Sequence, residues 1–178
     1  MSKMRAKAIF IDKDGTIVDN ARYPAVIPTD MIMEDEVIDG LLYLQRKGFK
    51  LILISNQPWI AQGKLTQEEV AGVFERMIRK LNAFGVRIDD YYFCPHQSSD
   101  SCSCKKPKPK LIYDAARKHA IDLRKSYIIG DMSSDIEAGK HAGIKTILVK
   151  TGCGKDFLDS AGPDFIIENI NQVSEVIP

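Results

Sequence analysis

Two aspartates, Asp12 and Asp14, follow the apolar run Ala8–Ile11 and lie beside Gly15 in the chain. If this run is a strand of a doubly wound sheet, both carboxylates project beyond its carboxyl end, where the ligand crevice of such sheets lies. Acids in that crevice are suited to bind a cation or to take part in a reaction. The alternative is a β-turn in which Asp and Gly satisfy only backbone groups.

A second acidic pair, Asp131 and Asp135, follows the apolar run Tyr127–Ile129. Carboxylates gathered from two strand ends repel one another, and a hard dication would relieve that repulsion. Mg²⁺ typically takes one or two carboxylates together with waters and phosphate oxygens, so we predict Asp131 to be a magnesium ligand. Asp135 has two interpretations: it supports the metal ligands, or it is a helix-start residue that complements the helix dipole.

A third apolar run, Leu51–Ile54, ends in Ser55 and Asn56. A hydroxyl and an amide can both hydrogen-bond phosphate oxygens without adding charge. Ser-Asn is also ordinary turn chemistry, so only the repeated placement at a strand end favours a phosphate-binding role for these two residues.

Lysines are concentrated in residues 105–110, where four of the six residues are Lys and the other two are Pro. A solvated charge run is the usual explanation of such a segment. Pro109, however, suits the start of a helix, and a lysine near a helix N-terminus can pair with phosphate. We assign this role to Lys106 and leave Lys108 and Lys110 to solvent.

Three of the four cysteines, Cys94, Cys102 and Cys104, fall within eleven residues beside His96. This clustering suits metal ligation in a reducing compartment better than it suits disulfides. Cys153 stands alone.

Short β-branched runs alternate with longer helical patterns along the chain. This alternation predicts an α/β fold with a doubly wound, mainly parallel sheet that helices cover on both faces. One helix is expected to begin at Thr66, where Thr66 and Glu69 form a capping box, and another to run from about Ser134 to Ala142. The expected strands are Ala8–Ile11, Leu51–Ile54, Tyr91–Phe93, Tyr127–Ile129, Thr146–Val149 and Phe165–Ile167.

The 178 residues carry 25 Lys and Arg against 24 Asp and Glu, and this net charge of +1 gives no global field that attracts nucleic acid or an acidic membrane surface. The hydrophobic 44% of the chain is spread over runs far shorter than the roughly 20 residues needed to cross a bilayer. The N-terminal segment has no signal-peptide pattern. We expect a cytoplasmic monomer without nucleic-acid or membrane partners.

The strand-end acids, the Ser-Asn pair and the lysine, in their order along the chain, resemble the four motifs of the haloacid dehalogenase superfamily. The resemblance implies that Asp12 attacks phosphorus and that Asp14 protonates the leaving oxygen and then activates water. It implies that Ser55 and Lys106 hold the phosphoryl group. Mg²⁺ would be bound by Asp12, the backbone carbonyl of Asp14, and Asp131.

The cysteine segment is similar to the zinc loop of one group in this superfamily, the heptose-bisphosphate and histidinol-phosphate phosphatases. Zinc would order the loop and set the direction of Lys105 and Lys106. Buried free thiols beside a chance histidine are the alternative, which the polar residues around them disfavour. The resemblance implies a closed tetrahedral zinc site made by Cys94, His96, Cys102 and Cys104.

Residues 56–66 resemble the heptose members of the group, as does Tyr23, whereas Pro58, Trp59 and Met132 depart from their pattern. Trp59 is expected either to stack on a substrate ring or to shield a helix end. Substrate choice is therefore less constrained by the sequence than the chemistry is.

The spacing between the motifs leaves no room for a separate cap domain, because independent domains rarely fall below roughly 50 residues. We expect one domain over residues 1–178 with an open site and a flap over residues 19–28. The favoured function is Mg²⁺-dependent removal of phosphate from a small sugar phosphate, with heptose bisphosphate as the substrate and its second phosphate near Lys105. The alternatives are histidinol phosphate or another sugar phosphate, and a zinc-stabilised phosphate-binding module without turnover.

Overall fold

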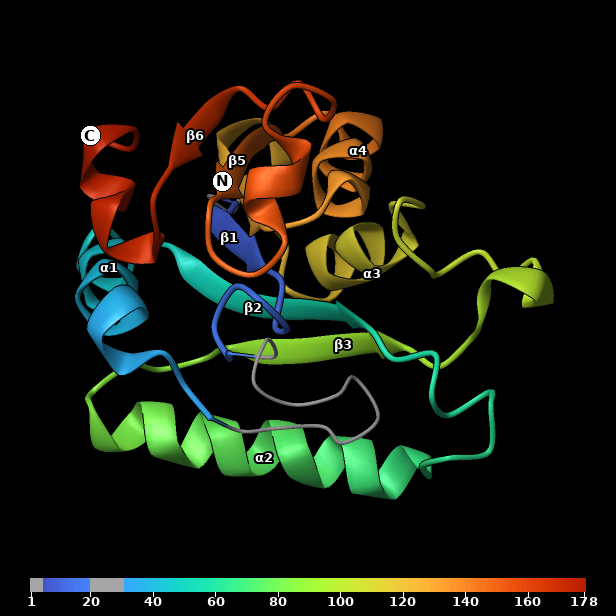
Figure 1. The fold of residues 1–178 in the computed structure, drawn as a ribbon. Coiled ribbons are helices and arrows are strands. Elements are labelled where there is room, and N and C mark those ends of the chain that lie inside the picture. The colour runs from blue at the N-terminus through green and yellow to red at the C-terminus, as the bar shows by residue number, and fades with distance from the viewer. Residues whose placement is uncertain (1–4, 20–30) are drawn as a thin grey trace.

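A parallel sheet organises the computed structural model, which describes residues 5–19 and 31–178. Its six strands lie in the order β3-β2-β1-β4-β5-β6, and each neighbouring pair is parallel (Figure 1). The chain starts in the middle of the sheet, builds one half, and then returns to build the other. The strands are β1 (Ala8–Ile11), β2 (Lys50–Asn56), β3 (Asp90–Cys94), β4 (Tyr127–Gly130), β5 (Lys145–Val149) and β6 (Phe165–Ile167).

Side chains that alternate along the strands supply two separate cores. In β1, Ile9 and Ile11 belong to one core, whereas Ala8 and Phe10 belong to the other, and all four are completely buried. Strands that are buried on both faces are apolar along their whole length, which is why the sequence shows short apolar runs instead of a polar alternation. The predicted doubly wound α/β fold is confirmed.

The helices divide between the two faces of the sheet. α1 (Glu34–Arg46) and α2 (Gln67–Ala83) supply side chains to the first core, together with the 3₁₀ turn Ile170–Glu175. α3 (Lys110–Lys118) and α4 (Ser133–Ala142) cover the second face (Figure 1). α3 therefore carries the end of the lysine-rich segment onto the sheet.

The predicted helix ends agree with the structure to within a residue. The Thr66 hydroxyl accepts the backbone N–H of Glu69, and the Glu69 carboxylate accepts the backbone N–H of Thr66, which is the capping box of α2. α4 begins one residue before the predicted start and ends at Gly143, whose φ of +69° is a left-handed conformation that glycine adopts without steric cost.

β2 is longer than the sequence predicts. It continues through Ser55 and Asn56, because these residues pair with Phe93 and Cys94 of β3. The hydroxyl and the amide therefore stand on a hydrogen-bonded strand and not in a turn. Their positions are fixed by the sheet.

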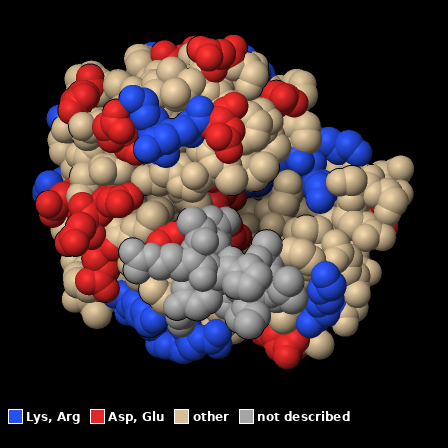
Figure 2. All heavy atoms as spheres, in the orientation of Figure 1, with Lys and Arg blue, Asp and Glu red and all other residues tan. Residues whose placement is uncertain are grey.

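In the described part of the chain, no helix combines the length and the apolar character that a membrane crossing requires. On the face seen in Figure 2, the described Lys and Arg side chains are interspersed with Asp and Glu and form no continuous basic stripe. Tyr23 and most of the expected flap lie outside the described residues.

Candidate active site

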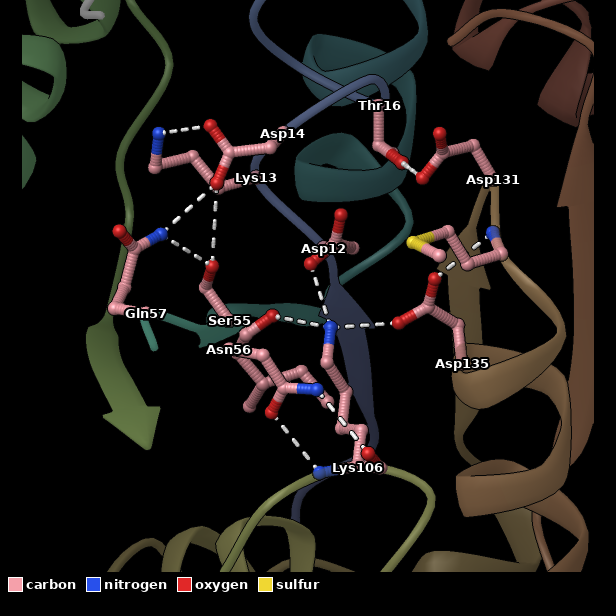
Figure 3. A network of polar contacts seen from close by, with 12 residues as sticks. Asp12, Lys13, Asp14, Thr16, Ser55, Asn56, Gln57, Lys106, Asp131 and Asp135 are labelled. Atoms are coloured by element: carbon pink, nitrogen blue, oxygen red, sulfur yellow. Dashed lines mark hydrogen bonds and ion pairs between the residues drawn. The ribbon is translucent and has the colours of Figure 1, made fainter. Parts of the chain in front are cut away.

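The strand order brings three predicted segments to one edge of the sheet. β1 lies between β2 and β4, so Asp12 emerges between Ser55 at the end of β2 and Asp131 just after β4. Figure 3 shows these side chains converging at the carboxyl ends of the strands. This convergence is the strand-end site that the sequence predicts.

Asp12 lies at the centre of the site and is only 6% exposed. Its Oδ1 atom is 2.5 Å from Nζ of Lys106. Burial raises the pKa of Asp12 well above its ordinary value; Lys106 opposes the rise, and the nearby carboxylates of Asp135 and Asp131 add to it. A buried acid among like charges is unfavourable for folding, and such groups concentrate at functional sites.

Lys106 joins three segments of the chain. Its Nζ atom donates to Asp12 at 2.5 Å, to Oδ1 of Asp135 at 2.6 Å and to the carbonyl of Ile54 at 3.1 Å (Figure 3). Burial alone would lower the pKa of Lys106, but the charges of Asp12 and Asp135 raise it above its ordinary value. Lys106 is therefore a fixed cation beside Asp12.

Asp135 uses its two oxygens for different purposes. One accepts from Lys106, and the other accepts the backbone N–H of Met132 at 3.1 Å, at the start of α4. The helix-start interpretation is thus confirmed for one oxygen, while the other holds the lysine of the site.

Asp131 is held tightly by backbone. Its Oδ2 atom accepts the N–H of Cys153 at 2.8 Å. A Cβ atom added at Gly15 or at Gly152 would lie 2.2 Å from the same oxygen, and both glycines have positive φ, so no other residue fits there. Burial, with a contribution from the charge of Asp135, raises the pKa of Asp131 to about 6.

A cation would relieve the mutual repulsion of these acids. One carboxylate oxygen from each of Asp12, Asp131 and Asp135 can be chosen so that all lie within 4.8 Å of one another. Hard oxygen donors gathered at this spacing are the type of ligand that Mg²⁺ takes. The residues present therefore fit the predicted magnesium ion.

Asp14 is held by a different set of donors. Its Oδ1 atom accepts from Nζ of Lys13 at 2.5 Å, and its Oδ2 atom accepts from Nε2 of Gln57 at 2.9 Å (Figure 3). The Ser55 hydroxyl lies 3.4 Å from the same Oδ2 atom. Neither Lys13 nor Gln57 was among the predicted site residues. The available signals were a lysine between two strand-end acids and an amide directly after Ser-Asn.

Asn56 bonds the backbone of the lysine-rich loop. Its Oδ1 atom accepts the N–H of Lys106 at 3.0 Å, and its Nδ2 atom donates to the Lys106 carbonyl at 3.1 Å. Both ends of the amide are thereby used to fix the residue that contacts Asp12. The predicted direct contact of Asn56 with phosphate stays a prediction.

The predicted zinc ligands Cys94, His96, Cys102 and Cys104 come together in space. Their donor atoms can be chosen within 4.8 Å of one another, and four of the pairs lie 3.1 Å to 3.6 Å apart. Tetrahedral zinc–sulfur bonds of about 2.3 Å place two sulfurs roughly 3.8 Å apart; the sulfurs of Cys94 and Cys102 lie 3.6 Å apart, and those of Cys94 and Cys104 are closer, at 3.1 Å. Burial and a hydrogen bond with Cys104 raise the pKa of the Cys94 thiol to about 12, and a metal ion bound there would favour the thiolate.

Lys105 lines an open cavity between the Cys/His cluster and the lysine segment of residues 105–110. The cavity has a volume of about 240 Å³ and is lined by Gln97, Ser98, Ser101, Cys102, Lys105, Lys106, Pro107 and Lys108. Three lysines thus border one hollow. Lys108 donates to the carbonyl of Cys102. Lys105 is half-buried and directly precedes Lys106, the lysine that contacts Asp12.

Comparisons with known proteins identify the family of the chain. A family model described as HAD-hydrolase-like matches residues 103–173. The chain is 34% identical to the D-glycero-beta-D-manno-heptose-1,7-bisphosphate 7-phosphatase of Yersinia pestis over 96% of this chain and 94% of the relative. The chain belongs to the HAD-like hydrolases.

Two further known proteins, one compared by sequence and one by structure, are similar to the chain. The D-glycero-alpha-D-manno-heptose-1,7-bisphosphate 7-phosphatase of Photorhabdus laumondii is 35% identical over 85% of this chain and 87% of the relative. The crystal structure of D,D-heptose 1,7-bisphosphate phosphatase from B. bronchiseptica, complexed with magnesium and phosphate, superposes with a TM-score of 0.85 at 26% identity, covering 95% of this chain and 96% of that chain.

Proposed function

We propose that this protein is a Mg²⁺-dependent phosphatase that removes the 7-phosphate of D-glycero-D-manno-heptose 1,7-bisphosphate through an aspartyl-phosphate intermediate. The observation that carries the proposal is the buried contact of 2.5 Å between the Asp12 carboxylate and the Lys106 ammonium at the carboxyl end of β1. It sets a nucleophile beside a permanent cation, with a second acid two residues away.

The proposed reaction has two steps. First, an oxygen of Asp12 bonds to phosphorus while the ester P–O bond breaks, and the leaving oxygen takes a proton from Asp14. Then water gives a proton to Asp14 and attacks the same phosphorus, the bond to Asp12 breaks, and inorganic phosphate leaves. Lys106 and Ser55 hold the transferring phosphoryl oxygens, and the charge of Lys106 balances theirs.

Mg²⁺ would be held by Asp12, Asp131 and the backbone carbonyl of Asp14, and when bound it would neutralise charge on the phosphate oxygens. The close approach of the Asp12 and Asp131 carboxylate oxygens supports this assignment for those two ligands. Lys106 would remain between Asp12 and Asp135 as the neighbouring cation.

Zinc would occupy the site made by Cys94, His96, Cys102 and Cys104. Four protein ligands leave no coordination position for substrate, so the zinc is structural. Its effect on the reaction is indirect. It orders the loop in which Cys104 directly precedes Lys105 and Lys106.

The two phosphates of the substrate would occupy different parts of the open site. The reacting phosphate would contact Ser55 and Lys106, and the second phosphate would lie near Lys105 at the lysine-lined cavity of about 240 Å³. Named relatives act on both the alpha and the beta anomer of heptose 1,7-bisphosphate at similar identity, so the proposal covers both anomers. We also propose that the protein works as a cytoplasmic monomer of one domain without a cap.

A panel of phosphorylated metabolites tests the proposal. Purified protein with Mg²⁺ should release phosphate fastest from heptose 1,7-bisphosphate, more slowly from heptose monophosphates and from histidinol phosphate. Histidinol phosphate as the best substrate would overturn the heptose assignment and leave the Asp12 chemistry standing. Binding of phosphate esters without any release of phosphate would support the non-catalytic module instead.

A further inference from the structure

We propose that Lys13 and Gln57, here called the Asp14 clamp, position Asp14 as the proton donor and acceptor of the reaction. The inference rests on the proposed function, because it assumes that Asp14 serves the leaving oxygen. It adds two positioning residues that do not themselves exchange protons with the substrate.

The clamp fixes both oxygens of one carboxylate. Lys13 donates to Oδ1 of Asp14 at 2.5 Å, and Gln57 donates to Oδ2 at 2.9 Å (Figure 3). A carboxylate held at one oxygen can still rotate about its terminal torsion, whereas one held at both oxygens cannot do so without losing a bond. The Asp14 side chain is 31% exposed, so it is fixed and still open to the crevice.

Gln57 is buried and fixed by several hydrogen bonds. It is 3% exposed, and its backbone N–H donates to the carbonyl of Cys94 at 2.8 Å. Its Nε2 atom donates to the hydroxyl of Ser55 at 2.9 Å as well as to Asp14. One amide therefore links the acid to the residue that would hold the phosphoryl group, which sets the distance between proton donor and phosphate.

Lys13 is the second half of the clamp and is completely buried. Its Nζ atom lies 2.5 Å from Oδ1 of Asp14 and 5.9 Å from the centre of the Phe74 ring. Removing an ammonium from water is costly, and a surface lysine could not hold a partner in one place so firmly. The buried position makes sense if this charge is needed to orient Asp14.

Two lysines thus separate the two acids of one short segment. Asp12 contacts Lys106, which comes from the lysine segment of residues 105–110, and Asp14 contacts Lys13, its own neighbour in the chain. The two carboxylates are thereby held in different directions. This division suits their different tasks, because one must reach phosphorus and the other must reach the leaving oxygen.

Dependence on the leaving group tests the clamp. Gln57→Met keeps the volume of the buried side chain and removes its donor; Gln67→Met, on the exposed first turn of α2, is the matched control. A good leaving group such as p-nitrophenolate needs no proton, whereas a sugar alkoxide does. For the sugar phosphate hydrolysed best by the wild type, we expect kcat/KM of Gln57→Met to fall about 10- to 100-fold, with KM nearly unchanged.

For p-nitrophenyl phosphate we expect kcat/KM of the same variant to fall less than about threefold, because kcat/KM reports the step in which the leaving group departs and not the later attack of water. Gln67→Met should match the wild type on both substrates. Lys13→Met should show the same selective loss, and Lys13→Arg should recover part of it because the cation is restored. Unfolding midpoints measured for all variants identify any that fail to fold.

Three results would overturn the clamp. They are wild-type kinetics in both methionine variants, an equal loss of kcat/KM on both substrates, or a loss that lies entirely in KM. In each of these cases a wild type that still releases phosphate leaves the proposed function standing. Absence of turnover by the wild type with every phosphate ester would overturn the proposed function, and the clamp with it.

Discussion

Two carboxylates of this protein lie at opposite ends of the sheet, Asp12 at the carboxyl end and Asp90 at the other. Both accept hydrogen bonds, but their pKa values shift in opposite directions. Burial and like charges raise the pKa of Asp12 well above its ordinary value despite Lys106. Burial also acts against Asp90, but hydrogen bonds, mainly from Lys118 and His119, lower the pKa of Asp90 to about 2. Asp90 is a stabilising group, whereas Asp12 is held in a setting that opposes its charge.

The origin of the donors explains the difference. Asp90 opens β3, and its partners Tyr92, Lys118 and His119 come from that strand and from the end of α3, at distances of 2.7 Å to 2.8 Å. Asp12 relies on Lys106, which follows the Cys/His cluster in the chain, and it lies near three other acids. Regular elements stabilise the first carboxylate, and a lysine from a loop that follows the Cys/His cluster holds the second.

The largest effect is expected at Asp12. Asp12→Asn should lower phosphate release by roughly 10⁴-fold or more, because an amide cannot serve as the nucleophile. Its unfolding midpoint should stay equal to or above that of the wild type, because one of several repelling charges is removed. Steady-state kinetics and thermal unfolding measure the two effects, and a variant with near-normal turnover would exclude the aspartyl-phosphate mechanism.

Loss of zinc should impair the site around Asp12 and spare the region around Asp90. Cys104→Ser, or chelation of the wild type, should remove about one zinc per chain and lower kcat/KM about 10- to 100-fold, because the loop that carries Lys106 loses its order. The sheet and the Asp90 contacts should persist, and circular dichroism checks them. Freshly purified protein without zinc by elemental analysis would contradict the prediction.

A smaller and more selective effect is expected at Lys105. Lys105→Ala should raise KM for heptose 1,7-bisphosphate about tenfold and change KM for a heptose monophosphate less, because only the bisphosphate places a second anion near this ammonium. Lys125→Ala, an exposed lysine at the other end of the sheet, serves as the control. Equal weakening of both substrates would place the second phosphate elsewhere.

The smallest effect on activity is expected at Asp90. Its pKa is lower in the folded protein than the ordinary 3.8, so its stabilisation is fully present above about pH 4 and is lost as the pH falls toward 2. Asp90→Asn should cost about 1–2 kcal/mol at pH 7 and leave kcat unchanged. Urea unfolding at pH 7 and at pH 3 should show a smaller pH-dependent loss for the variant than for the wild type.

The sequence predicts the parts of this protein that depend on local pattern. The apolar runs predict all six strands, and Thr66 with Glu69 predicts the start of α2, because burial and capping follow from residue type and spacing. Asp12, Asp131 and the Cys/His cluster were predicted from their placement at strand ends or from resemblance, and the structure brings each set together.

The contacts that the sequence could not predict depend on side-chain direction. The chain does not reveal that Gln57 turns toward Asp14, that Asn56 bonds the backbone of Lys106, or that Asp135 divides its oxygens between Lys106 and α4. Each contact joins segments whose relative orientation is set by packing of the whole sheet. The extension of β2 through Asn56 was missed for the same reason, since pairing with β3 decides it.

The three bonds of Lys106 also have a consequence for folding. They span 94, 52 and 29 residues of sequence, to Asp12, Ile54 and Asp135. Contacts that close such long loops form only after much chain entropy has been lost, so they tend to form late. A chain in which only one half of the sheet has folded therefore lacks the complete reaction site. A newly made molecule gains the Lys106 contacts around Asp12 only when the two halves of the sheet have joined.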